Sequence, residues 1–173
     1  MNSGKLKSGR VDTPIGRLIL IYNEGPLLLK QILLPGEEPN FPDRNPILKD
    51  AVLPAPDELV RIIIDSVNGV QSPLPWNIMS REGITPLQRA VYLQTHAIPY
   101  GALATYREIA ERIGRPKACR FVGSALAKNP FPILIPCHRV IRSDNKLGGF
   151  GGGLALKRLL IDFEAGLAHS DKR

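Results

Sequence analysis

The chain has 173 residues, which is enough for two small domains that each bury a hydrophobic core. Its two cysteines are 18 positions apart, so the sequence has neither a disulfide framework nor a Cys-x-x-Cys metal pair. No apolar stretch approaches the roughly 18 residues that span a bilayer, and the N-terminal part does not resemble a secretion signal. These features argue against membrane and disulfide-rich secreted proteins, and predict a soluble, intracellular protein without a structural metal.

The net charge of +7 is unevenly distributed along the chain. Residues 1–85 contain 9 Lys and Arg against 10 Asp and Glu, whereas residues 86–173 contain 14 against 6. The first half therefore carries −1 and the second half +8. A basic half is typical of a protein that binds a polyanion, although a solvated basic surface would have the same composition.

The first half reads as a small α/β scaffold. Two apolar runs, 17–22 and 27–34, flank the turn 23–26 and predict a β-hairpin. Six prolines between Pro35 and Pro56 predict an irregular loop, and the apolar spacing over 57–68 predicts a helix that ends before Gly69. No catalytic constellation occurs in this half.

The second half begins with three predicted helices. Thr85-Pro-Leu-Gln88 is a capping box that starts a helix to about Ala97, and Thr105-Tyr-Arg-Glu108 starts a second helix that ends near Gly114. Pro116 is expected to open a third helix that continues to about Ala127. A short helix, a glycine turn and another helix are the elements of a helix-turn-helix, although many helical hairpins have no DNA partner.

The third predicted helix has two different faces. Apolar side chains recur from Ala118 to Leu126 at the spacing of a buried stripe. The opposite face combines small residues with a single arginine, which suits close approach to a narrow groove better than plain solvation. That face consists of Cys119, Arg120, Gly123, Ser124 and Ala127.

The segment Ile135-Pro-Cys-His-Arg-Val-Ile141 places a cysteine beside a histidine and an arginine. A thiol is nucleophilic only as the thiolate, which a neighbouring imidazole or guanidinium favours. Taken alone, Cys137 would more often be a small apolar residue in a buried strand, and the surrounding motifs decide the matter. We expect the segment to be extended, with the side chains of Cys137 and His138 on opposite sides.

A glycine-rich loop and a final helix complete the chain. Residues 148–153 contain five glycines without the spacing of a phosphate-binding motif, which indicates a loop that another molecule approaches closely. A helix is predicted over 154–165, with an apolar stripe at 156, 159, 160 and 163 and with Gly166 as its stop. Glu164 lies at the edge of this stripe, where it could orient an imidazole.

Together these motifs resemble the O6-alkylguanine-DNA alkyltransferases. The resemblance covers residues 85–166 and rests on several spaced elements: Ile98-Pro-Tyr-Gly101, Thr105-Tyr106, Ala118-x-Arg-x-Val-Gly123, Asn129-Pro130, Ile135–Val140, Gly152-Gly153 and Lys157 through Glu164. The first half is similar only through Thr13-Pro-Ile-Gly16. The resemblance implies an α/β protein of two domains: a ribonuclease H-like scaffold over 1–84, and a mainly helical, winged helix-turn-helix-like alkyltransferase domain over 85–173.

The implied function is DNA repair by a suicide reaction. The protein would bind double-stranded DNA as a monomer without a cofactor, in the cytoplasm or in a eukaryotic nucleus. It would flip out O6-alkylguanine, and also O4-alkylthymine, and move the alkyl group irreversibly to Cys137. His138 would activate Cys137 through a water, Glu164 would hold the imidazole, and Tyr106 would protonate guanine N3.

The resemblance also assigns the remaining site residues. Asn129 would brace the active-site turn, and Arg120 would fill the vacated base stack. The DNA-binding set is Tyr106, Ala118, Cys119, Arg120, Gly123, Ser124, Ala127 and Lys128. The substrate-pocket set is Pro136, Val140, Phe150, Gly151 and Gly152.

Some positions depart from the family pattern. Phe150 replaces a common tyrosine, so a hydroxyl that could bond the guanine oxygen is missing, and Phe121 occupies a position where a small residue is common. The first half contains no His or Cys, so the metal ligands of some relatives have no counterparts. Two alternatives remain at this point: a non-catalytic alkyl-DNA sensor, in which the reactive cysteine is replaced, and a cysteine hydrolase.

Overall fold

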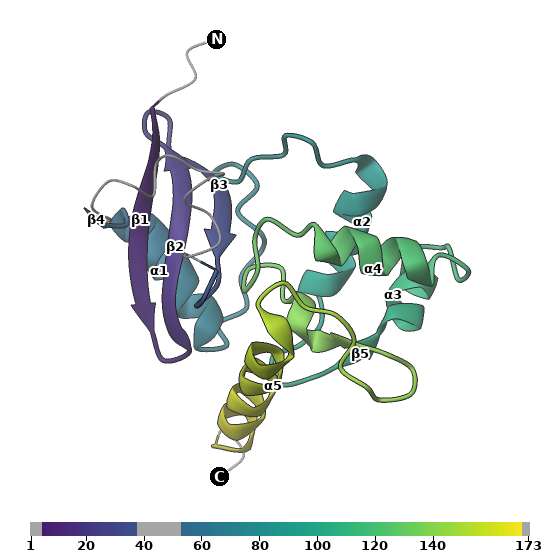
Figure 1. Cartoon of the computed structure of the whole chain (residues 1–173). Coiled ribbons are helices and arrows are strands. Elements are labelled where there is room, and N and C mark those ends of the chain that lie inside the picture. Colours follow the sequence, from purple (N-terminus) through teal and green to yellow (C-terminus); the bar gives the residue numbers. More distant parts are fainter. Residues whose placement is uncertain (1–4, 38–52, 171–173) are drawn as a thin grey trace. The chain divides into compact units, whose positions relative to one another are not determined.

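The computed structural model describes residues 5–37 and 53–170 of the chain (Figure 1). The fold is α/β, and the chain divides into two compact units, Met1–Glu82 and Gly83–Arg173. Each unit is described by itself. No helix of the described residues is long and apolar enough to cross a membrane.

Unit 1 is built on a sheet with the strand order β3-β2-β1-β4. Strands β1 (Leu6–Thr13), β2 (Gly16–Asn23) and β3 (Leu28–Leu33) form an antiparallel meander, and the short β4 (Leu53–Pro54) pairs in parallel with β1. The predicted hairpin over 17–34 is confirmed as β2 and β3. Most of the proline-rich segment, residues 38–52, lies outside the described residues.

Strand β1 was not predicted, because its residues lack the apolar alternation of a half-buried strand. Its position is set by its neighbours. Gly9 lies so close to Ala55 that a Cβ at this position would be 2.6 Å from the Ala55 Cα atom, so glycine lets the chain after β4 pass against β1. Propensity alone does not reveal such a tertiary contact.

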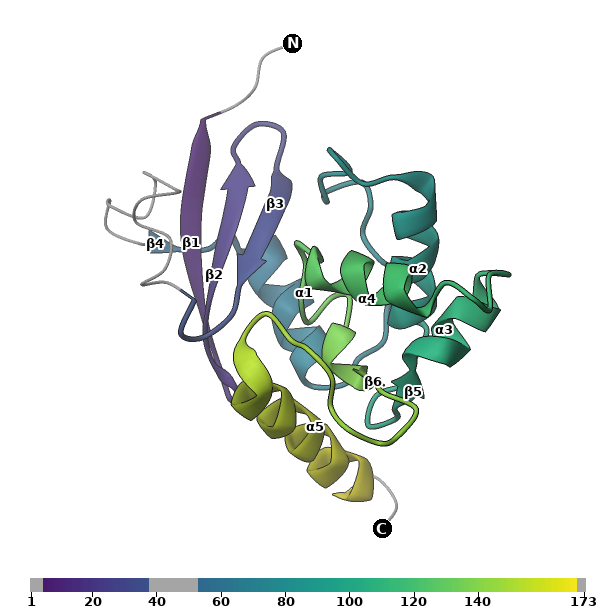
Figure 2. The same cartoon turned by 45° about the vertical axis from the view of Figure 1, so that its right-hand side comes forward.

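The core of unit 1 combines β2 with the helix α1 (Asp57–Val67), which lies against one face of the sheet in Figures 1 and 2. Residues 18–22 of β2 are all buried, and α1 buries Leu59, Ile63 and Val67, as its apolar spacing predicts. The free side of β3 receives a further bridge, since Leu29 exchanges backbone hydrogen bonds of 2.7 Å with Ile78 and Ser80.

Unit 2 contains the helices α2 (Pro86–His96), α3 (Tyr106–Arg112), α4 (Cys119–Ala127) and α5 (Gly153–Ser170). The two capping boxes are confirmed, because the side chains of Thr85 and Thr105 accept hydrogen bonds from the backbone of Gln88 and Glu108. Local chemistry alone starts these two helices.

A two-stranded parallel sheet joins the helical part of unit 2 to the chain that carries Cys137 (Figure 2). Strand β5 (Ala104–Thr105) pairs with β6 (Val140–Ile141). Tyr106 follows β5 directly, and the 3₁₀ turn Cys137–Arg139 precedes β6 directly. The pairing therefore holds the start of α3 beside the Cys-His-Arg segment.

Several predicted boundaries in unit 2 are wrong. Helix α4 begins at Cys119 rather than at Pro116, because residues 116–117 form a turn before it. Helix α5 continues past Gly166 to Ser170, because glycine weakens a helix without being obliged to end it. Residues 137–139 form a 3₁₀ turn and not an extended segment.

The predicted apolar stripe of α5 is also partly wrong. Leu160 is buried, but the side chain of Leu159 is 48% exposed. Lys157, which lies outside the predicted stripe, is fully buried. The inner face of α5 is therefore more polar than its sequence indicates, and it faces the functional site described next.

Candidate active site

A sharp turn between α4 and the 3₁₀ segment positions Cys137. The side chain of Asn129 organises it: Nδ2 donates to the Ile135 carbonyl at 2.9 Å, and Oδ1 accepts from the Phe131 amide at 3.0 Å. Ile133 lies within this turn at φ 76°, a left-handed conformation that a β-branched residue adopts only when its surroundings impose it. Asn129 thus holds the chain in the shape that places Cys137.

A second anchor of this turn comes from α2. His96 Nδ1 lies 2.8 Å from the Leu134 carbonyl, and since a carbonyl can only accept, Nδ1 carries the proton and donates. The histidine at the C-terminal end of α2 therefore fastens the middle of the turn. Nothing in the sequence singled out this contact.

Cys137 lines a cavity of about 300 Å³. Cys137 is 9% exposed, and its Sγ atom accepts a hydrogen bond from Asn129 Nδ2 at 3.3 Å. Helix α4 and the glycine-rich loop provide most of the wall. The lining residues are Tyr106, Gly123, Leu126, Ala127, Cys137, Gly149, Phe150 and Gly151.

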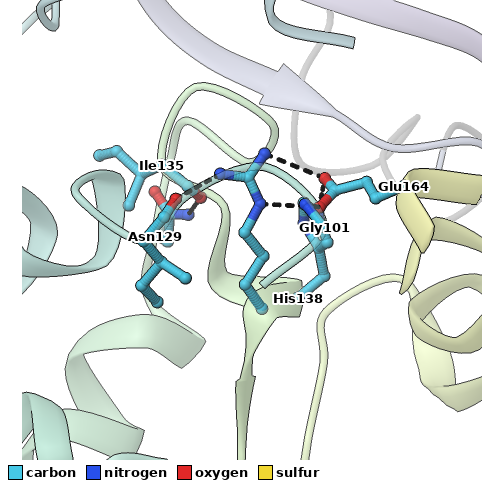
Figure 3. A network of polar contacts seen from close by, with 7 residues as sticks. Gly101, Asn129, Ile135, His138 and Glu164 are labelled. Carbon is cyan, nitrogen blue, oxygen red and sulfur yellow. Dashed lines mark hydrogen bonds and ion pairs between the residues drawn. The ribbon is translucent and has the colours of Figure 1, made fainter. Parts of the chain in front are cut away.

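The carboxylate of Glu164 on α5 accepts hydrogen bonds from two segments, the 3₁₀ turn Cys137–Arg139 and the chain at Gly101 (Figure 3). His138 Nε2 lies 2.6 Å from Oε1, and the Gly101 amide donates to Oε2 at 3.2 Å. Arg139 contributes two further bonds, from Nε to Oε2 at 2.9 Å and from an Nη to Oε1 at 3.1 Å. The imidazole, guanidinium and carboxylate are all buried.

The charge states in this network follow from burial and hydrogen bonding. Burial alone would raise the pKa of Glu164, but the bonds from His138 and Arg139 outweigh it and lower the pKa to about 2. Burial lowers the pKa of His138 more than its bond to Glu164 raises it, so the imidazole is neutral near pH 7. Because an ionised carboxylate only accepts, the proton is on Nε2, and Nδ1 carries a lone pair.

Two polar atoms of this site are poised for proton transfer. His138 Nδ1 is buried and has no hydrogen-bond partner among the described residues, so its lone pair is available to accept a proton. Tyr106, on the cavity wall, has its pKa raised by burial and by the nearby Cys137, so it remains a protonated phenol at neutral pH. The site thus contains a base beside the thiol and an acid across the cavity.

The loop wall packs closely on Tyr106. Gly148 has φ 70°, and a Cβ built on it would be 2.9 Å from the Tyr106 hydroxyl oxygen. The ring of Phe150 meets the His138 ring edge-on, with centroids 6.4 Å apart and planes at 80°. Glycine at position 148 therefore lets the loop pack on Tyr106, while Phe150 of the same loop contacts His138.

Some of the predicted site residues line the cavity and others do not. Cys137, Tyr106 and Phe150 meet at the cavity, together with Gly123, Ala127 and Gly151. Three residues of the predicted pocket set do not line it. Val140 is fully buried with its carbonyl bonded to Lys157, Pro136 is buried at the start of the 3₁₀ turn, and Gly152 lies beyond the lining segment.

The predicted DNA face lies along α4 and its two ends. Arg120, Ser124, Ala127 and Lys128 are exposed, whereas Ala118, Cys119 and Gly123 are half-buried. Gly123 and Ala127 also line the cavity, so this small-residue face borders it. Among the described residues, no group of three or more His, Cys, Asp or Glu could hold a metal ion.

Sequence reasoning missed two buried cations of this site, Arg139 as the partner of Glu164 and Lys157 beneath the loop. Arg139 also donates to the Ile98 carbonyl at 2.7 Å and lies 5.3 Å from the centre of the Tyr100 ring. A charged residue within an otherwise apolar segment is the signal that could have identified Arg139.

Comparison with known proteins gives a consistent result for this site. A family model described as "6-O-methylguanine DNA methyltransferase, DNA binding domain" matches residues 86–166. A Haemophilus influenzae relative is 48% identical over 88 residues, which are 51% of this chain and 49% of the relative. A Methanothermobacter thermautotrophicus relative is 38% identical over 114 residues, or 64% of each chain. Both carry the name methylated-DNA--protein-cysteine methyltransferase. The chain therefore spans between about half and two thirds of the length of these curated relatives.

Solved structures extend the match to nearly the whole chain. The structure of Mycobacterium tuberculosis OGT in complex with DNA is 32% identical, with a TM-score of 0.71 over 93% of this chain and 94% of that one. A Pyrococcus kodakaraensis O6-methylguanine-DNA methyltransferase has the same TM-score at 20% identity, which shows the likeness of fold. The fold and the site thus define a cysteine-centred protein with the DNA-binding domain of a guanine methyltransferase. The chain belongs to the methylated-DNA--protein-cysteine methyltransferase family.

Proposed function

We propose that this protein repairs alkylated DNA by moving the alkyl group of O6-alkylguanine, and of O4-alkylthymine, to its own Cys137 in a single turnover. One observation carries the proposal: Cys137, only 9% exposed, lines a cavity of about 300 Å³ together with Gly123 and Ala127 of the small-residue face of α4. A base inside a duplex cannot reach such a thiol, so the substrate must enter as a flipped nucleotide.

The neighbours of the thiol support this chemistry. His138 Nδ1 takes the thiol proton through a bridging water, while Glu164 holds the imidazole by its Nε2 proton. The Asn129 amide, 3.3 Å from Sγ, favours the thiolate and braces the turn. The sulfur then forms a bond to the alkyl carbon as the carbon–O6 bond breaks. A thioether has no leaving group, so the reaction ends there.

The departing guanine needs a proton, and Tyr106 is placed to supply it. Its phenol is protonated at neutral pH because burial raises its pKa, and its ring forms part of the cavity wall. Donation to N3 neutralises the charge that develops on the base as O6 leaves. In this chain Phe150 adds no hydroxyl at the loop wall, so O6 lacks the hydrogen bond that a tyrosine at this position would donate.

DNA binding follows from α4 and from the charge of unit 2. Arg120 is exposed on the small-residue face and fills the space left by the flipped base. The rest of the interface comprises Ala118, Cys119, Gly123, Ser124, Ala127 and Lys128. The +8 charge of residues 86–173 supplies contacts to phosphates, which makes affinity salt-dependent and only weakly sequence-dependent.

The finer architecture belongs to the same proposal. We assign residues 1–84 to a ribonuclease H-like scaffold and residues 85–173 to a winged helix-turn-helix-like domain, in which the loop after β6 is the wing. The sheet of β1 to β4 with α1, and the succession of α3 and α4, support these assignments. The protein acts as a monomer in the cytoplasm, or in the nucleus of a eukaryote, where its thiol stays reduced.

A stoichiometric assay tests the proposal against both alternatives. Increasing amounts of protein are incubated with excess duplex that contains O6-methylguanine, and the restored guanine is counted. We expect one guanine per chain, and Cys137→Ser should bind the duplex without restoring any. Binding without transfer by the wild-type protein would indicate a sensor. Catalytic turnover of an ester or peptide would indicate a cysteine hydrolase.

A further inference from the structure

The proposed chemistry leaves one buried charge without a role. Lys157 on α5 is fully buried, and its ammonium donates to three backbone carbonyls. The distances are 2.7 Å to Val140, 2.5 Å to Leu147 and 3.4 Å to Gly149. A fully buried lysine is rare, and here none of its recorded hydrogen-bond partners is a carboxylate.

The three carbonyls belong to two segments that form the active site. Val140 begins β6 directly after the Cys137–Arg139 turn, whereas Gly149 belongs to the glycine-rich loop 148–153 and Leu147 directly precedes it. Gly149 also lines the cavity, followed along the chain by Phe150 and Gly151. One ammonium therefore links the strand that follows the nucleophile to the opposite wall of the cavity.

Glycines make this link necessary. A run of glycines has few side chains to pack and loses more conformational entropy on ordering than other sequences. The loop must nevertheless place its backbone against a flipped base and pack Gly148 on Tyr106. Hydrogen bonds from a residue of a helix can supply the missing order.

We propose that Lys157 is a positioning residue, which holds the glycine-rich loop in its substrate-binding shape by bonding carbonyls of the loop and of β6 at once. It contacts no reacting atom and acts through the loop. Only the measurement of alkyl transfer rests on the proposed function, because the order of the loop can be measured without substrate.

The surroundings of Lys157 make the link sensitive to pH. Burial lowers the pKa of Lys157 to about 8, with the nearby Cys137 acting in the opposite direction. His138 faces it from the 3₁₀ turn, and the Tyr106 ring of α3 lies 6.0 Å from Nζ. Below pH 8 three N–H groups and a full charge serve three carbonyls. As the pH rises through 8, the neutral amine keeps only two N–H groups, and the loop loosens.

The test compares two neighbouring substitutions. Lys157→Met keeps the length and the apolar stem of the side chain but removes the ammonium. Arg158→Met removes a cation from the adjacent exposed position of the same helix and serves as the control. Each protein is examined by hydrogen exchange of the amides of residues 147–152, by single-turnover transfer from free O6-benzylguanine, and by DNA affinity.

We expect Lys157→Met to remain folded, to exchange its loop amides at least about tenfold faster, and to transfer at least about tenfold more slowly, with little change in DNA affinity. Arg158→Met should keep the wild-type loop protection and the wild-type rate from the free base. Wild-type loop protection in Lys157→Met, or an unchanged rate per folded molecule, would overturn the proposal. Failure of the wild-type protein to accept any alkyl group would instead overturn the proposed function, while the exchange data would still decide the role of Lys157.

If Lys157→Met does not fold, the wild-type protein decides the matter. Exchange is compared at about pH 7 and about pH 9, corrected for the intrinsic effect of pH on amide exchange. The loop amides should lose protection at the higher pH, while those of α2 should not. Equal changes in the loop and in α2 would contradict the proposal.

Discussion

Replacing Arg139 by methionine tests the electrostatic design of the active site. Arg139 donates two hydrogen bonds to Glu164 and one to the Ile98 carbonyl, and both charged side chains are only 7% exposed. Hydrogen bonds to charged groups contribute about 1.5–3 kcal/mol each to stability, and removing one member of a buried ion pair leaves the other charge buried without a partner. We therefore expect Arg139→Met to lower the free energy of unfolding by about 3–5 kcal/mol at neutral pH.

Urea unfolding of four proteins measures this cost: the wild type, Arg139→Met, Glu164→Gln and the double variant. The double variant should be less destabilised than the sum of the single variants, because it leaves no stranded carboxylate. The acid dependence provides a second check. Glu164 has a pKa of about 2 when folded and an ordinary value of 4.5, so the stability it adds is full above pH 4.5 and is lost as the pH falls through 2. A cost below about 1 kcal/mol, as for an exposed ion pair, would refute this reasoning.

Three further predictions concern the base, the loop and the DNA face. The free energy of unfolding should fall as the pH is lowered from about 7.5 to 5.5, because burial lowers the pKa of folded His138 below its ordinary value of 6.5, so the unfolded chain binds the proton first. The free energy should depend less steeply on pH in His138→Gln. Equal pH dependence in the two proteins would argue against a buried neutral imidazole. Phe150→Tyr should raise the single-turnover rate by up to about tenfold, the effect of one added hydrogen bond of about 1 kcal/mol. An unchanged rate would contradict this prediction and show that another group, such as a loop amide, stabilises the leaving oxygen. Arg120→Ala should slow repair of duplex DNA far more than transfer from free O6-benzylguanine, and similar losses on both substrates would show that Arg120 is not a stacking wedge.

Local chemistry made much of this protein predictable. The capping boxes at Thr85 and Thr105 each depend on residues three positions apart, so the sequence alone locates the starts of α2 and α3. The Cys137-His138 pair is ambiguous taken alone, and the motifs around it are what made it the candidate reactive centre. Spaced motifs over residues 85–166 then indicated the family, which the comparisons show.

What escaped prediction depends on contacts between distant segments. Lys157 has the sequence context of a surface lysine, and only the fold brings three carbonyls to its ammonium. Strand β1 is polar in sequence and is ordered by β2 and by the approach of Ala55 to Gly9. The 3₁₀ turn at Cys137 follows from the side chain of Asn129, eight residues earlier, which no local pattern encodes.

The site of alkylation tests the account most directly. The wild-type protein is incubated with an O6-methylguanine duplex, its intact mass is measured, and the adduct is located by peptide mapping. Asn129 donates to the Cys137 thiol, and the adjacent His138 is held by Glu164, whereas the other thiol, Cys119, has only the Pro116 carbonyl, 3.8 Å away, as its recorded partner. We therefore predict a gain of one methyl group per chain, on Cys137, with no further gain on longer incubation. A methyl group on Cys119, or a second one on the same chain, would contradict the account.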